Sequence, residues 1–152
     1  MDIQISSRCR KNSGSLRAVA VRLRRFAAVF DDAVKVYVVF AGDPVVRELN
    51  LRFRHKDAAT NVLSFSLDQA DPEDGRLILG EIVISVDTAA REAEAAGMPL
   101  ERRIEALFVH GFVHLLGYDH EKGGRMALRM REKEGTIMEL LAMQGRKRPR
   151  KH

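Results

Sequence analysis

The chain has little of what stabilises small secreted proteins. Among its 152 residues there are one cysteine and four prolines, and there is no tryptophan. The single thiol, Cys9, cannot form a disulfide within the chain. No apolar run is long enough for a membrane span, and no signal-like segment occurs. We therefore expect a cytoplasmic protein that does not associate with a membrane.

Composition and length favour one globular domain. Hydrophobic residues make up 45% of the chain and charged residues 31%, as in ordinary globular proteins. A chain of this length buries roughly two thirds of its unfolded surface, which is enough for one core without disulfides. We expect this domain to span residues 1–145, followed by a basic, disordered tail at 146–152.

Positive charge is unevenly distributed. Lysine and arginine outnumber aspartate and glutamate by 26 to 21, for a formal net charge of +5. Basic residues gather between Arg8 and Arg25 and again in the tail. Such clusters attract polyphosphate and make binding salt-dependent, so a nucleic acid is a plausible partner.

Hydrophobic periodicity predicts alternating elements. Strands are expected at 2–6, 34–40, 61–65 and 77–85, and helices at 16–30, 43–53, 87–96, 100–116 and 125–144. Asp43 and Asp87 are the expected helix caps, and 68–76 is expected to be a loop. The helix at 16–30 should bury Leu16, Val19, Leu23, Phe26 and Phe30. This order predicts a single α+β domain with one mixed sheet of about four strands, against which the helix from residue 100 is buried.

Three histidines are concentrated near the end of that helix. His110 and His114 lie four residues apart, so their side chains share one face of a helix. Gly117 can end the helix and turn the chain back, which would bring His120 to the same point. Three imidazoles and a water molecule form the ligand set of a catalytic zinc site. We therefore predict one Zn²⁺ per chain, although such ligands also accept nickel, cobalt or iron.

Two families carry a similar histidine pattern. Zinc proteases related to the metzincins have a glutamate directly after the first histidine, which acts as general base. Here that position is Gly111, which cannot accept a proton. The segment His110-Gly111-Phe112-Val113-His114-Leu115-Leu116-Gly117-Tyr118-Asp119-His120 more closely resembles the signature of the YbeY family of bacterial endoribonucleases.

A second segment supports this resemblance. The YbeY family has a block that this chain matches at Leu49, Asn50, Phe53, Arg54, Lys56, Asp57, Thr60, Asn61, Val62, Leu63, Ser64 and Phe65. The chain departs from it at Ser66, where family members commonly have proline. The resemblance covers roughly residues 45–141.

The resemblance implies a zincin-like fold and a metal-dependent endoribonuclease that is specific for single strands. The implied substrate is the 3′ end of 16S ribosomal RNA, with a role in ribosome quality control. The implied metal ligands are His110, His114 and His120. Arg54 and His110 would be catalytic, and Arg54 and Lys56 would bind substrate. Implied partners are ribosomal RNA, the small ribosomal subunit, a ribosomal protein and a ribosome-associated GTPase.

Two alternatives remain open from the residues. One is a metallohydrolase that acts on another substrate, peptides included. The other is a non-catalytic ribosome assembly factor in which the metal is structural. The motif itself contains no evident general base.

Overall fold

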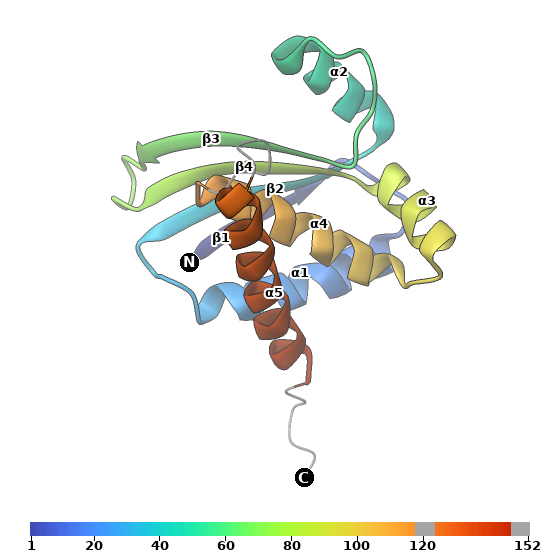
Figure 1. The fold of residues 1–152 in the computed structure, drawn as a ribbon. Helices are drawn as coiled ribbons and strands as arrows, with labels where there is room; N and C mark the ends of the chain where they lie inside the picture. The colour runs from blue at the N-terminus through green and yellow to red at the C-terminus, as the bar shows by residue number, and fades with distance from the viewer. Residues whose placement is uncertain (118–123, 147–152) are drawn as a thin grey trace.

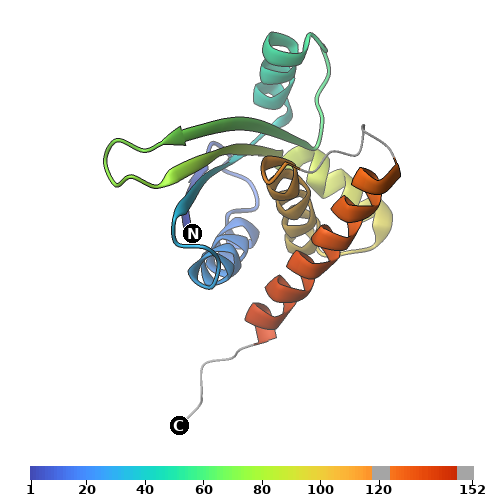
Figure 2. The same ribbon diagram turned by 60° about the vertical axis from the view of Figure 1, so that its left-hand side comes forward.

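The computed structural model describes residues 1–117 and 124–146. The chain forms a four-stranded sheet with α1, α4 and α5 gathered on one face and α2 on the other (Figures 1 and 2). The elements in chain order are β1 (Asp2–Ser7), α1 (Ser13–Ala28), β2 (Val34–Ala41), α2 (Asp43–Arg54), β3 (Val62–Ala70), β4 (Leu77–Ser85), α3 (Val86–Ala96), α4 (Leu100–Leu115) and α5 (Gly124–Arg146).

The sheet is mixed, with the strand order β1-β2-β4-β3. β1 and β2 pair in parallel, as do β2 and β4, whereas β3 runs antiparallel to β4. The predicted α+β class and the sheet of about four strands are confirmed. β3 is an edge strand and carries on to Ala70, beyond the predicted end at residue 65. Gln69 and Ala70 pair with β4 beyond an irregularity between Ser66 and Gln69. β3 therefore extends into residues 68–70, where the polar sequence predicts a loop.

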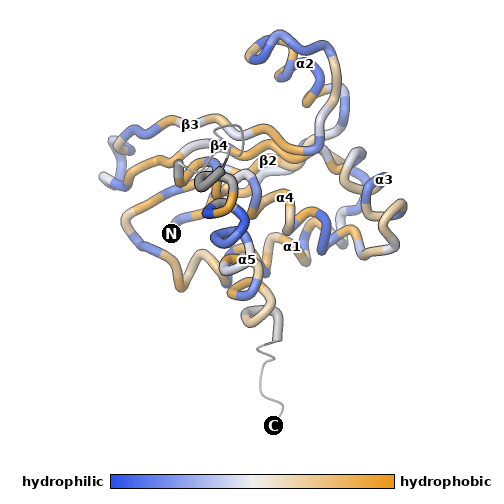
Figure 3. Tube along the Cα trace, viewed as in Figure 1, coloured by the Kyte–Doolittle hydropathy of each residue, from blue (hydrophilic) through white to orange (hydrophobic). Residues whose placement is uncertain are grey.

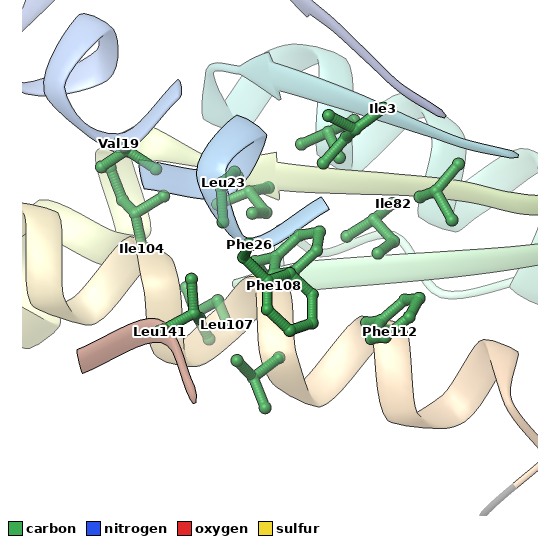
Figure 4. Packing of buried hydrophobic residues seen from close by; sticks show 14 of the residues in the cluster. Ile3, Val19, Leu23, Phe26, Ile82, Ile104, Leu107, Phe108, Phe112 and Leu141 are labelled. Atoms are coloured by element: carbon green, nitrogen blue, oxygen red, sulfur yellow. The ribbon is translucent and has the colours of Figure 1, made fainter. Parts of the chain in front are cut away.

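The main core lies between the sheet and α1, α4 and α5. Phe26 of α1 meets Phe108 and Phe112 of α4 edge-on, with ring centroids 6.3 and 6.0 Å apart (Figure 4). All three rings are fully buried, and burial of such a side chain stabilises the fold by about 1.5–3 kcal/mol. The predicted stripe of α1 is buried from Leu16 to Phe26. Phe30 is half-buried and lies beyond the helix, which ends two residues earlier than predicted.

Apolar residues concentrate along β2, β4 and α4, whereas α2 and the β3–β4 turn are largely polar (Figure 3). α2 buries only Val46 and Asn50 among its twelve residues. The helix therefore packs on the sheet through a narrow contact, and its carboxyl-terminal turn projects from the body of the protein (Figure 1).

Two predicted helix caps are wrong, for one shared reason. α2 is capped by Gly42, and Asp43 is its first residue. The Asp43 carboxylate instead accepts hydrogen bonds of 2.6 Å from the hydroxyls of Ser85 and Thr88. α3 is capped by Ser85, while Asp87 accepts a 2.8 Å hydrogen bond from the backbone N–H of Asp43. The aspartates join the two helix starts to each other, which fixes α2 beside the carboxyl ends of β2 and β4.

A charged cluster holds the β3–β4 turn against the rest of the sheet. Lys35 of β2 is buried, forms a short ion pair with Asp71 and lies 2.9 Å from Asp74 and 3.6 Å from Asp2. The two carboxylates of the turn raise the pKa of Lys35. Lys35 in turn lowers the pKa of Asp71. A hydrogen bond from the backbone N–H of Arg76, together with Lys35, lowers the pKa of Asp74 to about 2.

Within residues 1–117 and 124–146, no helix has the length and apolar character that crossing a bilayer requires.

Candidate functional site

α4 places two histidines one turn apart near its carboxyl end. His110 and His114 are half-buried on a helix whose other late residues are almost all buried. Their ring centroids are 4.8 Å apart and the rings are nearly perpendicular. α4 ends at Leu115, and Gly117 follows with a φ of 98°, a conformation that favours glycine. His120, the third predicted ligand, lies outside the described residues.

Gly111 lets α4 approach the sheet closely between these histidines. A Cβ atom at this position would lie 2.9 Å from Ile82 Cγ2 and 2.9 Å from Ser64 Oγ. The Ser64 hydroxyl donates a 3.2 Å hydrogen bond to the Gly111 carbonyl, which joins β3 to α4 at this level. The position therefore has no room for the glutamate that zinc proteases carry there.

Arg54 reaches the same region from the other face of the sheet. It is the last residue of α2, where His55 ends the helix in a left-handed conformation with a φ of 58°. The Arg54 guanidinium donates a 3.3 Å hydrogen bond from Nη2 to the carbonyl of Ser64 on edge strand β3. The following loop is anchored by Asn50, whose Nδ2 donates a 2.8 Å hydrogen bond to the Ala58 carbonyl.

These residues surround one cleft with a volume of about 380 Å³. Its lining residues are Arg54, Thr60, Asn61, Val62, Ser64, Ser66, His110 and His114. Hydroxyl, amide, imidazole and guanidinium groups dominate this lining, so the cleft suits a polar and anionic ligand. Asn61 is held in place because its Nδ2 donates to the Glu92 carboxylate at 3.2 Å.

The structure brings together three of the predicted site residues. Arg54, His110 and His114 line the cleft. Lys56 is exposed and is not among the lining residues, so its role in substrate binding stays a prediction. The sequence pattern did not single out Thr60, Asn61, Ser64 or Ser66 as site residues, because isolated small polar residues are common in loops and strands.

A carboxylate from α5 contacts the first histidine. Glu134 Oε1 lies 3.1 Å from His110 Nδ1. In the neutral tautomer that donates from Nδ1, this contact fixes the orientation of the ring, and Nε2 is then the unprotonated nitrogen. α5 is held in place by Ile137 and Leu141, both fully buried. Glu134 is far from the histidines in sequence and belongs to no recognisable motif, so the sequence gives no signal for this contact.

The donor groups fit a metal ion of the kind that imidazoles prefer. Two histidines lie side by side in a polar cleft, and a carboxylate contacts one of them. Histidines that bind metal ions commonly donate their second ring N–H to such a carboxylate. The described part of the chain contains no cluster of three or more histidine, cysteine, aspartate or glutamate side chains placed to hold a metal. It contains two of the three predicted ligands.

Comparison with known proteins identifies the family. The family model described as Endoribonuclease YbeY matches residues 5–142. The chain belongs to the YbeY family. It is 46% identical over 109 residues to the Endoribonuclease YbeY of Aquifex aeolicus, covering 72% of this chain and 71% of the relative. It is 39% identical over 150 residues to that of Geobacter metallireducens, covering 95% and 99%.

A solved structure agrees with the fold of this YbeY family member. The solution structure of TM1509 from Thermotoga maritima superposes with a TM-score of 0.63 at 28% sequence identity, covering 97% of this chain and 93% of that one. The family resemblance of the two sequence segments is therefore confirmed, and the match includes α2, the cleft and α4.

Proposed function

We propose that this protein is a metal-dependent endoribonuclease that cleaves single-stranded RNA. The main support for this proposal is that Arg54, His110 and His114 line one polar cleft. Arg54 comes from α2 and the histidines from α4, on opposite faces of the sheet. The names of the relatives, all endoribonucleases, support RNA as the substrate.

In this proposal His110, His114 and His120 hold one Zn²⁺. The ion would supply a Lewis acid and lower the pKa of a water molecule towards neutrality. Glu134 would keep His110 in the tautomer that presents Nε2. His110 is thus assigned a catalytic role as a ligand, and no general base is assigned.

Arg54 would bind the phosphate at the cleavage point. A guanidinium has five N–H donors in a planar fork that matches phosphate oxygens. The bond to the Ser64 carbonyl uses one donor and orients the group along the edge of β3. The remaining donors could neutralise charge that develops on the phosphate during cleavage. Lys56 would contact the RNA backbone outside the cleft.

The geometry of α4 disfavours peptide hydrolysis by the zinc-protease mechanism. That mechanism needs a glutamate where this chain has Gly111, and the neighbouring Ile82 and Ser64 leave no space for one. The lining residues offer hydroxyls, an amide and a guanidinium instead, which suit a phosphodiester better than a peptide.

We assign the natural substrate as 16S ribosomal RNA near its 3′ end, in small-subunit maturation and ribosome quality control. This assignment rests on membership of the YbeY family. We further propose that the protein acts in the cytoplasm, in contact with the small subunit, a ribosomal protein and a ribosome-associated GTPase.

The test is RNA cleavage by zinc-loaded protein, metal-free protein and an Arg54→Ala variant, all at matched purity. Arg52→Ala is the control, because Arg52 lies on the same helix, is exposed and pairs with Glu48. Loss of a charge-assisted hydrogen bond costs about 1.5–3 kcal/mol, so Arg54→Ala should cleave about 10- to 150-fold more slowly than Arg52→Ala. Metal-free protein should be inactive.

Equal cleavage by all of these preparations would refute the catalytic assignment. A His114→Ala protein that folds and still supports ribosome maturation would instead favour an assembly factor that binds RNA without cutting it.

A further inference from the structure

We propose that Phe53 is a stacking platform for an unpaired nucleobase beside the cleft. The proposal rests on single-stranded RNA being the substrate, as argued above. Phe53 is 58% exposed at the end of α2, directly before Arg54. An aromatic ring left in solvent next to a phosphate-binding arginine is the combination that single-stranded RNA sites use, since bases stack on the ring while cations hold the backbone.

The Phe53 ring is held in place by a second phenylalanine. Phe65 of β3 meets it in a tilted, nearly edge-on contact, with ring centroids 5.4 Å apart and an interplanar angle of 62°. Phe65 is half-buried and packs against a small apolar cluster that includes Val46, Leu63 and Val83. Phe53 therefore has a fixed support, although more than half of its surface remains in solvent. A preorganised ring loses little conformational freedom when a base stacks on it.

The aromatic pair is adjacent to the cleft across the edge of the sheet. Ser64 and Ser66 line the cleft, and Phe65 lies between them in β3. Because successive side chains of a strand point to opposite faces, Phe65 and Phe53 lie on the α2 side of the same edge. Arg54 links the two sides through its bond to the Ser64 carbonyl. A base stacked on Phe53 would therefore lie beside the phosphate site that we propose at Arg54.

The surroundings of Phe53 favour RNA over an apolar protein partner. Arg54 and Lys56 follow Phe53 closely in the chain, and all three side chains are exposed. Leu51, the neighbouring exposed apolar residue on α2, lies about 200° around the helix from Phe53. The exposed part of the ring thus lies next to cationic side chains, and this combination complements a polyanion that carries planar bases.

The absence of tryptophan from the chain makes a direct test possible. A Phe53→Trp variant carries a single tryptophan at the proposed site, and stacking of a base should quench its selectively excited fluorescence. The probe is a short single-stranded RNA, titrated in the presence of a chelator so that binding is measured without cleavage. A Leu51→Trp variant is the control on the far side of α2. Quenching should occur at position 53 with the single strand, and be weak with the same RNA in a duplex.

Affinity measurements provide the second arm. Phe53→Leu keeps an apolar side chain but removes the aromatic face, and stacking is worth about 1–3 kcal/mol per base. Phe53→Leu should therefore bind the single strand about 5- to 150-fold more weakly, and Phe53→Trp should restore binding. In cleavage assays of metal-loaded protein the loss should fall mainly on KM, since a base stacked away from the reacting phosphate contributes equally to ground and transition states.

Unchanged affinity of Phe53→Leu, or equal quenching at positions 51 and 53, would overturn the inference while leaving the proposed function intact. A wild-type protein that neither binds nor cuts single-stranded RNA would overturn the proposed function itself.

Discussion

Replacing Gly111 with alanine should destabilise the protein, although the same change elsewhere in a helix stabilises it. Glycine inside a helix is less stable than alanine by about 0.5–1 kcal/mol, because it loses more backbone freedom on folding. Gly135 of α5 shows this case: it is exposed, and a methyl group added there would have no neighbouring atom within 4 Å. Gly135→Ala should therefore stabilise the protein by about that amount.

At Gly111 a steric cost opposes the same gain. The new methyl carbon would lie 2.9 Å from Ile82 Cγ2 and from Ser64 Oγ. The Ser64 hydroxyl can rotate, but Ile82 is fully buried in a central strand and cannot move aside freely. Overpacking of this kind costs about 1–3 kcal/mol. The gain from replacing glycine with alanine in a helix is the same at both positions. Gly111→Ala should therefore be less stable than Gly135→Ala by the steric cost, about 1–3 kcal/mol.

Urea and thermal unfolding of the two variants and the wild type would measure this difference. In a chain of 152 residues, 1 kcal/mol corresponds to a shift in Tm of about 2–4 °C. The two variants should thus differ by several degrees, with the wild type between them or close to Gly111→Ala. Equal stability of the two variants would refute the argument that α4 needs a glycine to approach β3 and β4.

The remaining predictions concern the metal and the charged cluster. Glu134→Ala should weaken zinc binding about 10- to 100-fold, measured by calorimetric titration, because it removes the carboxylate beside the first histidine of α4. Glu132→Ala is the control on α5, and equal affinities would contradict the assignment. Zinc at 100 times its Kd should stabilise wild-type protein by about 2.7 kcal/mol, but His114→Ala far less. A zinc-dependent Tm that persists in His114→Ala would count against this ligand. Lys35→Met should be less stable than wild type above pH 4. The difference should shrink as pH falls towards 2, because the pKa of Asp74 is lowered to about 2 and its favourable pairing is lost on protonation. A difference that stays constant across this range in denaturant titrations would show that the pair contributes nothing through its charge.

Local pattern was sufficient to predict most elements and the placement of two histidines. Helix and strand periodicity depend on residues within a turn of each other, so α1, α4 and β4 could be read from spacing alone. The four-residue interval put His110 and His114 on one helical face for the same reason. The mixed sheet followed from the order of the elements.

What the spacing could not supply are contacts between residues far apart in the chain. Pairing with β4 makes β3 longer than its sequence pattern predicts. Asp43 does not cap α2, because it forms hydrogen bonds with Ser85 and Asp87 at the start of α3. The convergence of Arg54 on the histidine cleft and the contact of Glu134 with His110 likewise depend on which faces of the helices are buried. Helix and strand propensities depend only on neighbouring residues in the chain. Contacts between distant residues depend instead on how apolar faces are buried across the whole sheet, and therefore on the complete fold.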